Sequence, residues 1–262
     1  MPDDVWGIGA AYEPYVGRWS RIVASRLLSW LDVAPDGRWV DVGCGTGALT
    51  RAVLEEREPR EVIGVDPSAT FLAYARETVT DPRARFEEGS ATALPRPDDS
   101  ADALVSGLVL NFVPEPSAAV REMARVGQPG AVIGAYVWDY AEGMQLMTHF
   151  WAAAVAVDPA AEELDEGARF PLCQPEPLRD LFAAGGLADV QVEAIVVPTP
   201  FASFDDYWAP FLGAVGVAPA YAMSLPEDVR ERLRDNLRAR LPYADDGSVP
   251  LTARAWAVRG RC

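Results

Sequence analysis

The segment WVDVGCGTGALT, residues 39–50, decides the fold, because it reads as a buried strand that passes through a glycine-rich turn into a helix. Gly43, Gly45 and Gly47 let a ligand approach the main chain closely, and the start of the following helix offers free N–H groups. The segment therefore predicts a ligand site at the carboxyl end of this strand.

An acidic residue inside this strand separates two kinds of nucleotide ligand. Gly43, Gly45 and Ala48 also match the G-x-G-x-x-G/A pattern of dinucleotide-binding folds, so the turn alone fits an NAD(P)-dependent oxidoreductase. The carboxylate of Asp41, at the mouth of the turn, would repel a pyrophosphate but attract the ammonium group of a methionine moiety. This charge favours S-adenosylmethionine (SAM), which carries no phosphate, over NAD(P).

The next predicted strand, residues 62–65, ends at a second carboxylate. Asp66 follows the glycine-rich turn by about 20 residues, where nucleotide-binding sheets receive a ribose diol. Its two oxygens can accept hydrogen bonds from both ribose hydroxyls. The alternative is an Asx turn that only caps the following helix, for which Ser68 is also suited as N-cap.

Short apolar strands alternate with amphipathic helices along the first half of the chain. Because strands separated by helices pair in parallel, this half predicts a doubly wound α/β sheet. We expect strands at 38–42, 62–65, 84–86, 103–106 and 132–137, and helices at 16–31, 47–55, 68–78 and 117–126. After residue 138 we expect helices at 144–157, 176–184, 204–212 and 227–241, and strands at 190–197 and 251–258.

Composition limits the class of protein and its partners. The 262 residues, 50% of them apolar, suffice for one α/β core with a lid and fall short of two ordinary domains. The formal net charge of -16 repels nucleic-acid phosphate and anionic lipid. Cys44, Cys173 and Cys262 are too widely spaced for a zinc site or a disulfide framework, and no apolar run suggests a leader or a membrane span. We therefore expect a cytoplasmic protein without nucleic-acid, membrane or metal partners.

Four segments together resemble the class I SAM-dependent methyltransferases, in particular the small-molecule branch related to quinone-biosynthesis C-methyltransferases. They are DVGCGTG at 41–47, VDPS at 65–68, GSATALP at 89–95 and SGLVLNF at 106–112, in this order. The resemblance implies a seven-stranded, mixed, Rossmann-like sheet whose last strand is inserted antiparallel beside the sixth. It also implies methyl transfer from SAM to a small molecule, with S-adenosylhomocysteine (SAH) as product.

The resemblance also divides the chain, which we expect to form a single domain over residues 1–262. This domain has a cofactor-binding core at 36–138, a cofactor-covering segment at 1–35 and helical lid insertions at 139–185 and 198–247. In such a covering segment Tyr15 would lie over the methionine part and Arg18 would pair with its carboxylate, although both also fit a plain helix start.

Adenine recognition departs from the family pattern. Relatives usually have Gly-Asp-Ala where this chain has Ser90, so recognition falls to the neighbouring Ala91 and Thr92. The expected cofactor-binding residues are Tyr15, Arg18, Asp41, Gly43, Cys44, Gly45, Asp66, Pro67, Ser68, Ser90, Ala91, Thr92, Ser106, Gly107 and Leu108.

The acceptor pocket is expected in the second half of the chain and after the fourth segment. Aromatic residues crowd into 201–223, where they form either a lid over an apolar pocket, a satellite core or a dimer interface. The expected pocket residues are Asn111, Phe112, Met147, Phe150, Trp151, Trp208 and Phe211, of which the first two also fit a turn and the core.

A proton acceptor is the least defined part of the predicted site. His149, the sole histidine, is the leading candidate by pKa, ahead of Asp139, Tyr140 and Glu142. Attack on a sulfonium needs no acid and often no strong base, so we do not expect His149 to be essential. A non-catalytic protein that binds SAM or SAH stays open as an alternative, as do a monomer and a homodimer.

Overall fold

The computed structural model describes residues 18–213 and 216–262, without the side chain of Arg18, and divides into two compact units. The core unit comprises residues 20–137, 174–195 and 256–262. The helical unit comprises Arg18 and Trp19 with the described residues of 138–173 and 196–255. Each unit is considered by itself below.

Within the described residues, seven strands form one mixed sheet in the order β3-β2-β1-β4-β5-β7-β6. Their bounds are β1 Arg38–Val42, β2 Glu61–Asp66, β3 Ala84–Glu88, β4 Ala101–Gly107, β5 Gly127–Trp138, β6 Ala188–Phe201 and β7 Val249–Arg261. β1 pairs in parallel with β2 and β4, β2 with β3, and β4 with β5. Backbone hydrogen bonds from Gly130 to Cys262 and from Cys262 to Ala131 show that β7 runs antiparallel to β5. The expected seven-stranded sheet with its last strand inserted beside the sixth is confirmed.

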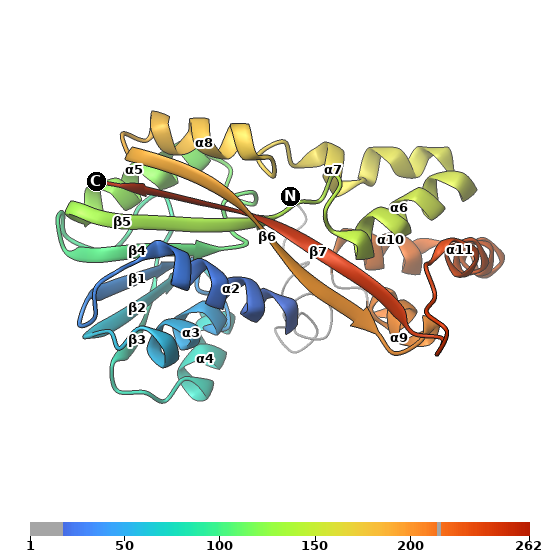
Figure 1. Ribbon diagram of the computed structural model, residues 1–262, viewed down its shortest axis with the longest axis horizontal. Helices are drawn as coiled ribbons and strands as arrows, with labels where there is room; N and C mark the ends of the chain where they lie inside the picture. Colours follow the sequence, from blue (N-terminus) through green and yellow to red (C-terminus); the bar gives the residue numbers. More distant parts are fainter. Residues whose placement is uncertain (1–17, 214–215) are drawn as a thin grey trace. The chain divides into compact units, whose positions relative to one another are not determined.

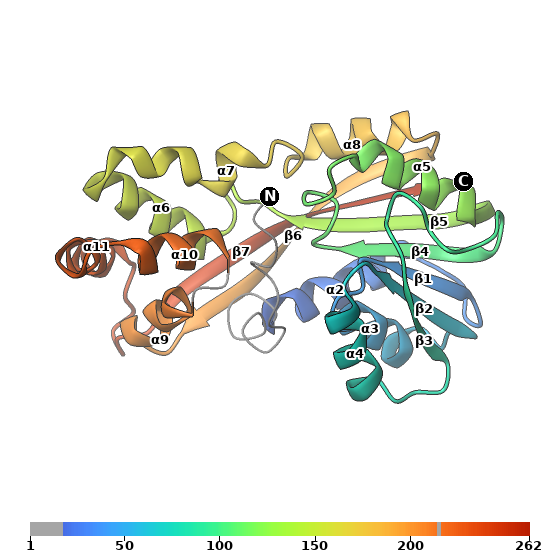
Figure 2. The ribbon, with the colours of Figure 1, turned by 180° about the vertical axis from the view of Figure 1, so that it is seen from behind.

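Five helices of the described chain cover the sheet of the core unit. They are α2 Arg18–Leu31, α3 Ala48–Glu56, α4 Ala69–Thr78, α5 Pro116–Val126 and α8 Pro175–Ala184. Figures 1 and 2 show α2, α3 and α4 on one face and α5 with α8 on the other. Leu31 of α2 packs directly on Gly134 of β5. A side-chain carbon on residue 134 would lie only 2.4 Å from the Leu31 side chain. Ser68 caps α4 by accepting from the backbone N–H of Phe71, as predicted.

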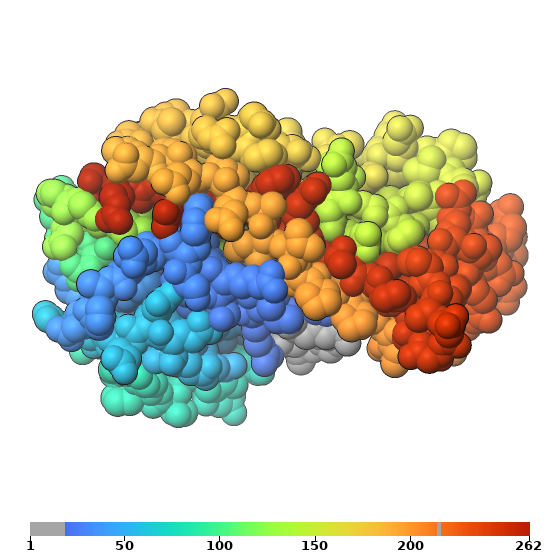
Figure 3. Space-filling view, viewed as in Figure 1, coloured from blue at the N-terminus to red at the C-terminus, as the bar shows by residue number. Residues whose placement is uncertain are grey.

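The apolar stripe of α2 explains why this helix forms and where it packs. Leu27, Leu28 and Leu31 are fully buried at helical spacing, while Ile22 on the other side is 39% exposed. The blue and cyan atoms in Figure 3 mark the solvent-facing surface of α2 and α3.

The helical unit contains more helix than the sequence predicts. Its helices are α6 Gln145–Val157, η2 Pro159–Leu164, α7 Glu166–Arg169, α9 Phe204–Trp208, η3 Ala209–Leu212, α10 Val217–Ser224 and α11 Glu227–Arg240. The helices η2, α7 and α10 were not expected. Of these, η2 and α7 each begin at an aspartate, Asp158 or Asp165, whose side chain accepts a hydrogen bond from a backbone N–H. The predicted helix at 204–212 is divided into α9 and η3, because Pro210 interrupts the α-helical hydrogen bonding.

The lid boundaries expected from the sequence differ from these elements in two places. β6 continues to Phe201, beyond the expected insertion start at 198, and α8 belongs to the core unit rather than to a lid. A one-domain organisation with a lid stays a prediction. None of the described helices is both long enough and apolar enough to cross a bilayer.

Candidate functional site

The glycine-rich turn leaves the carboxyl end of β1 in a conformation that glycine favours. Gly43, Gly45 and Gly47 have φ of 74°, 52° and 83°. The backbone N–H groups of Gly43 and Cys44 both donate to the carbonyl of Val65, at 2.8 and 3.1 Å, which ties the turn to β2. A side-chain carbon at Gly45 would meet no described atom within 4 Å, so the main chain there faces open space.

Asp66 ends β2 and is held by two backbone donors. Its Oδ2 accepts from the N–H of Gly45 at 2.9 Å, and its Oδ1 accepts from the N–H of Ser68 at 2.8 Å. Burial raises the pKa of this carboxyl, against the lowering effect of both hydrogen bonds. Each oxygen keeps further acceptor capacity, so the Asx-turn contact leaves Asp66 able to accept hydrogen bonds from a ligand, and its binding of the ribose stays a prediction.

The sequence places Asp41 at the mouth of the turn, but in the structure its side chain is more deeply buried than that position suggests. Only 1% of its surface is exposed. Thr50 on α3 donates its hydroxyl to Oδ2 at 2.7 Å, while Oδ1 has no hydrogen-bond partner among the described residues. Burial raises the pKa of Asp41 to about 7, although the Thr50 hydrogen bonds lower it. The contribution of Thr50 could not be read from the sequence, because it depends on how α3 packs against β1.

The segment after β4 lies against the glycine-rich turn. A side-chain carbon at Gly43 would come within 2.5 Å of Val109, and Ser106 donates its hydroxyl to the carbonyl of Val42 at 2.9 Å. Leu108 has a left-handed φ of 62°, a strained conformation that clusters at functional sites. The structure thus brings the first, second and fourth predicted segments together at the carboxyl ends of β1, β2 and β4.

The third segment forms a small turn after β3. The hydroxyls of Ser90 and Thr92 are hydrogen-bonded at 2.9 Å, and the N–H of Thr92 also donates to Ser90 Oγ at 3.2 Å. Gly89 donates its N–H to the carbonyl of Asp66 at 3.2 Å, so this turn adjoins the predicted ribose site. Ala91 is half-buried and Pro67 is exposed. Tyr15 lies outside the described residues, and so does the side chain of Arg18.

The predicted pocket residues fall into two groups. Asn111 is half-buried and Phe112 is 39% exposed after β4, and the amide nitrogen of Asn111 has no partner among the described residues. The other five, Met147, Phe150, Trp151, Trp208 and Phe211, are buried in the helical unit. Phe150 stacks on Phe211 with ring centroids 4.4 Å apart, so these side chains build a satellite core of that unit. Their contact with a substrate stays a prediction.

The proton-acceptor candidates also belong to the helical unit. His149 is half-buried, and burial, followed by the charge of Arg240, lowers its pKa. Asp139 is 1% exposed and accepts from Arg254 Nε at 2.6 Å. Sequence reasoning missed Glu166, which is 6% exposed, accepts from the indole of Trp151 and has its pKa raised to about 7 by burial. No sequence signal marks it, because an acidic residue in a four-residue helix ordinarily faces solvent.

Comparisons with known proteins agree with this geometry. A family model described as a methyltransferase domain matches residues 40–134. A demethylmenaquinone methyltransferase from Roseiflexus sp. (strain RS-1) is 32% identical over 169 residues, which cover 59% of this chain and 69% of that protein. A 2-methyl-6-phytyl-1,4-hydroquinone methyltransferase from Synechocystis sp. is 30% identical over 182 residues, which cover 68% of this chain and 56% of that protein. The solved structure of the YcgJ protein from Bacillus subtilis has a TM-score of 0.60 at 19% identity, covers 93% of this chain and 98% of its own, and supports the fold alone.

Proposed function

Since this chain belongs to the class I SAM-dependent methyltransferase family and SAM is its methyl donor, we propose that it methylates a small organic molecule. The family assignment removes the NAD(P)-dependent oxidoreductase and the non-catalytic binding protein as alternatives. What the chain has to provide is a site for SAM, a site for the acceptor and the exclusion of water between them.

The observation that carries the SAM site is a pair of buried carboxylates with unused acceptor capacity. Asp66 Oδ1 and Oδ2 each accept one backbone N–H and can each accept one ribose hydroxyl as well. Asp41 Oδ1 is buried without a partner among the described residues, and a cationic ammonium group would compensate it. The open space over Gly45 lets a ligand approach the backbone. The residues present therefore fit SAM, with Asp66 for the ribose and Asp41 for the ammonium group.

SAM supplies a methyl group that its sulfonium already activates, so the chain's own residues mainly bind, orient and exclude water. The hydrogen bond from Ser106 to Val42 and the close packing of Val109 on Gly43 keep the segment after β4 against the glycine-rich turn, which fixes one wall of the site. Because its pKa is lowered, His149 is neutral at pH 7 and can accept a proton, but displacement from a sulfonium proceeds without acid catalysis. We therefore propose a positioning mechanism in which no single general base is indispensable.

Charge and kinship support a small-molecule acceptor. The net charge of -16 opposes binding to nucleic-acid phosphate. The two relatives compared above are named for a demethylmenaquinone and a phytylhydroquinone, so quinols are the first acceptors to test. Cys44, Cys173 and Cys262 are all unpaired thiols, which fits a reducing compartment such as the cytoplasm.

The proposal is tested in two steps, binding before turnover. Calorimetry with SAM, SAH and NADH should show binding of the first two, with loss in Asp66→Ala. The protein is then incubated with small-molecule extract, DNA, RNA and protein substrates and with SAM carrying a deuterated methyl group, and products are identified by mass spectrometry. Label in a small molecule supports the proposal. Label confined to protein or nucleic acid contradicts a small-molecule acceptor while leaving the SAM site intact.

A further inference from the structure

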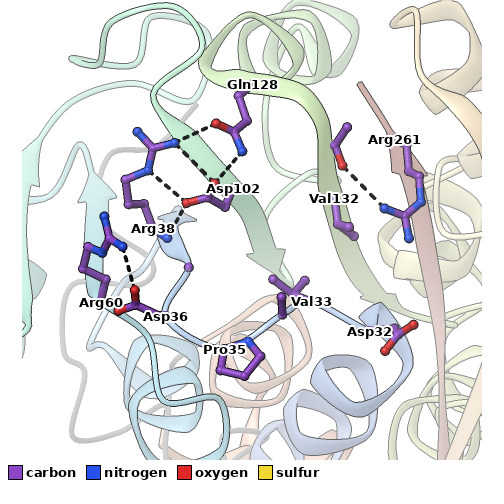
Figure 4. Close-up of a pocket in the computed structure, with 13 residues that line it drawn as sticks. Asp32, Val33, Pro35, Asp36, Arg38, Arg60, Asp102, Gln128, Val132 and Arg261 are labelled. Carbon is purple, nitrogen blue, oxygen red and sulfur yellow. Dashed lines mark hydrogen bonds and ion pairs between the residues drawn. The ribbon is translucent and has the colours of Figure 1, made fainter.

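The charged groups at the two ends of the central strands differ in how they are paired. At the amino ends, Figure 4 shows Arg38 and Gln128 converging on Asp102, and Asp102 accepts from Arg38 Nε at 2.9 Å. These opposite charges neutralise each other. Near the carboxyl end of β1, Asp41 is buried, and its Oδ1 has no hydrogen-bond partner among the described residues. A buried carboxylate that still needs a partner therefore lies beside the glycine-rich turn.

Asp41, Gly107 and Tyr136 point to the same face of the sheet. Asp41 on β1 pairs with Val105 on β4, two residues before Gly107. Gly107 pairs in turn with Tyr136 on β5. Paired residues on neighbouring strands share a face of the sheet, and so do residues two apart on one strand. The carboxylate of Asp41 and the phenol of Tyr136 therefore lie on either side of the bare main chain of Gly107.

The phenol ring of Tyr136 lies across Gly107. A side-chain carbon at residue 107 would lie 2.8 Å from the Tyr136 hydroxyl oxygen and 2.9 Å from two carbons of its ring. Glycine thus leaves this space to the ring. Burial raises the pKa of Tyr136 against the effect of its hydrogen bond to Ser20, and the charge of Asp41 raises it further. The hydroxyl is therefore protonated and lies within electrostatic reach of Asp41.

The hydroxyl of Tyr136 joins β5 to the first turn of α2. It is hydrogen-bonded to Ser20 Oγ at 2.8 Å and can also donate to the carbonyl of Ser20 at 3.5 Å. Tyr136 is 2% exposed and Ser20 is 7% exposed, so both hydroxyls are removed from bulk water. A buried hydroxyl that loses its partner is destabilising, so each of these two residues holds the other in place.

The rest of α2 is anchored without this bond. Its apolar stripe packs on the sheet through fully buried leucines, and Ser25 in its second turn donates to Glu56 of α3 at 3.0 Å. Loss of the bond between Ser20 and Tyr136 therefore leaves the helix docked and loosens its first turn alone.

We propose that Tyr136 is a positioning residue for SAM, which holds the first turn of α2 beside the methionine part of the cofactor through its hydrogen bond to Ser20. This rests on the proposed function, in which Asp41 binds the ammonium group of that part. Ser20 and Tyr136 form the side of the site that faces α2 and keep water from the ion pair, which strengthens it. The strand order β2-β1-β4-β5 puts Asp66, the proposed ribose ligand, on the side of Asp41 away from Tyr136.

Calorimetry with two ligands tests this role. SAH carries both the adenosine and the amino-acid part of the cofactor, whereas methylthioadenosine lacks the amino-acid part. Tyr136→Phe keeps the ring over Gly107 and removes the hydroxyl. The variant should bind SAH about fivefold more weakly, as expected for one lost hydrogen bond, and should bind methylthioadenosine within about twofold of the unmodified chain. A merely structural role would weaken both ligands by the same factor.

Two further variants separate this bond from the rest of α2. Ser20→Ala should weaken SAH binding by the same factor as Tyr136→Phe. The double variant should lose no more than either single variant, because both changes remove one bond. Ser25→Ala is the matched control, since it removes the hydroxyl that α2 donates to Glu56, and it should leave both affinities unchanged.

Unchanged SAH affinity in Tyr136→Phe, an equal loss for both ligands, or an equal loss in Ser25→Ala would overturn the proposal. If SAH still binds the unmodified chain and Asp41→Asn weakens it, such a result leaves the proposed cofactor site standing. If Asp41→Asn has no effect, the ammonium site is wrong and the role of Tyr136 falls with it. Ser20→Ala makes the same decision if Tyr136→Phe does not fold.

Discussion

We predict that Asp41 makes the affinity for the cofactor depend on pH. Its pKa is raised to about 7 by burial, so the group is largely protonated in the free protein at pH 5 and ionised at pH 8. In the proposed site only the ionised form pairs with the ammonium group of SAM or SAH, so affinity should rise with pH and level off above about pH 7. At two pH units below this pKa about 1% of the protein is ionised, which weakens binding by roughly a hundredfold.

The substitution Asp41→Asn removes the charge and keeps an oxygen for the Thr50 hydroxyl, which donates to Asp41 Oδ2 at 2.7 Å. At pH 8 the variant should bind SAH about a hundredfold more weakly than the unmodified chain, the equivalent of about 2.7 kcal/mol, because it lacks the ionised form at every pH. At pH 5 the two proteins should converge, because protonated aspartic acid and asparagine are both neutral. The loss at pH 8 does not reflect unfolding, because removal of a desolvated charge raises the free energy of unfolding there.

The assay is isothermal calorimetry with SAH between pH 5 and pH 8, in buffers of different ionisation enthalpy that reveal proton release on binding. Asp102→Asn is the matched control, because it removes a carboxylate in the same unit near the amino end of β4, away from the carboxyl ends of the strands where Asp41 lies. Its dependence of affinity on pH should equal that of the unmodified chain. If Asp41→Asn retains the full pH dependence, the ammonium group is bound elsewhere and the assignment of Asp41 is wrong.

Three further predictions concern other groups. Asp66→Ala should weaken SAM binding about a hundredfold, because two hydrogen bonds to a charged acceptor are lost, and unchanged affinity by calorimetry would contradict the ribose assignment. Glu166→Gln should raise the free energy of unfolding by roughly 3 kcal/mol at pH 8 and by little at pH 4.5. The pKa of Glu166 is about 7 in the folded protein and lower in the unfolded chain, so the unmodified protein loses stability as the pH rises from the unfolded pKa to the folded one. Thermal melts at both pH values check this, and equal effects at both would show that the buried charge is not responsible. His149→Asn should lower turnover by less than about tenfold once an acceptor is known, whereas a hundredfold loss with unchanged SAM affinity would make His149 the general base.

Local sequence patterns were sufficient for the elements that carry the cofactor site. The first strand was predicted at residues 38–42, where β1 lies, because its apolar run ends at glycines whose positive φ values other residues adopt only with strain. Ser68 was predicted as the cap of α4 from its residue type and position alone. The resemblance to the methyltransferase family added the sheet order, including the inserted last strand, which strand patterns cannot supply.

Tertiary structure decided which polar groups lose water and which partners they gain. Asp41 and Glu166 are both buried, and each gains a donor from another element, the hydroxyl of Thr50 on α3 for Asp41 and the indole of Trp151 on α6 for Glu166. Phe150 and Phe211, two of the residues expected to line the acceptor pocket, stack on each other in the helical unit, and their contact with a substrate stays a prediction. Helix and strand periodicity reflects neighbours a few residues apart, whereas desolvation, pKa and packing depend on contacts between residues far apart in the chain.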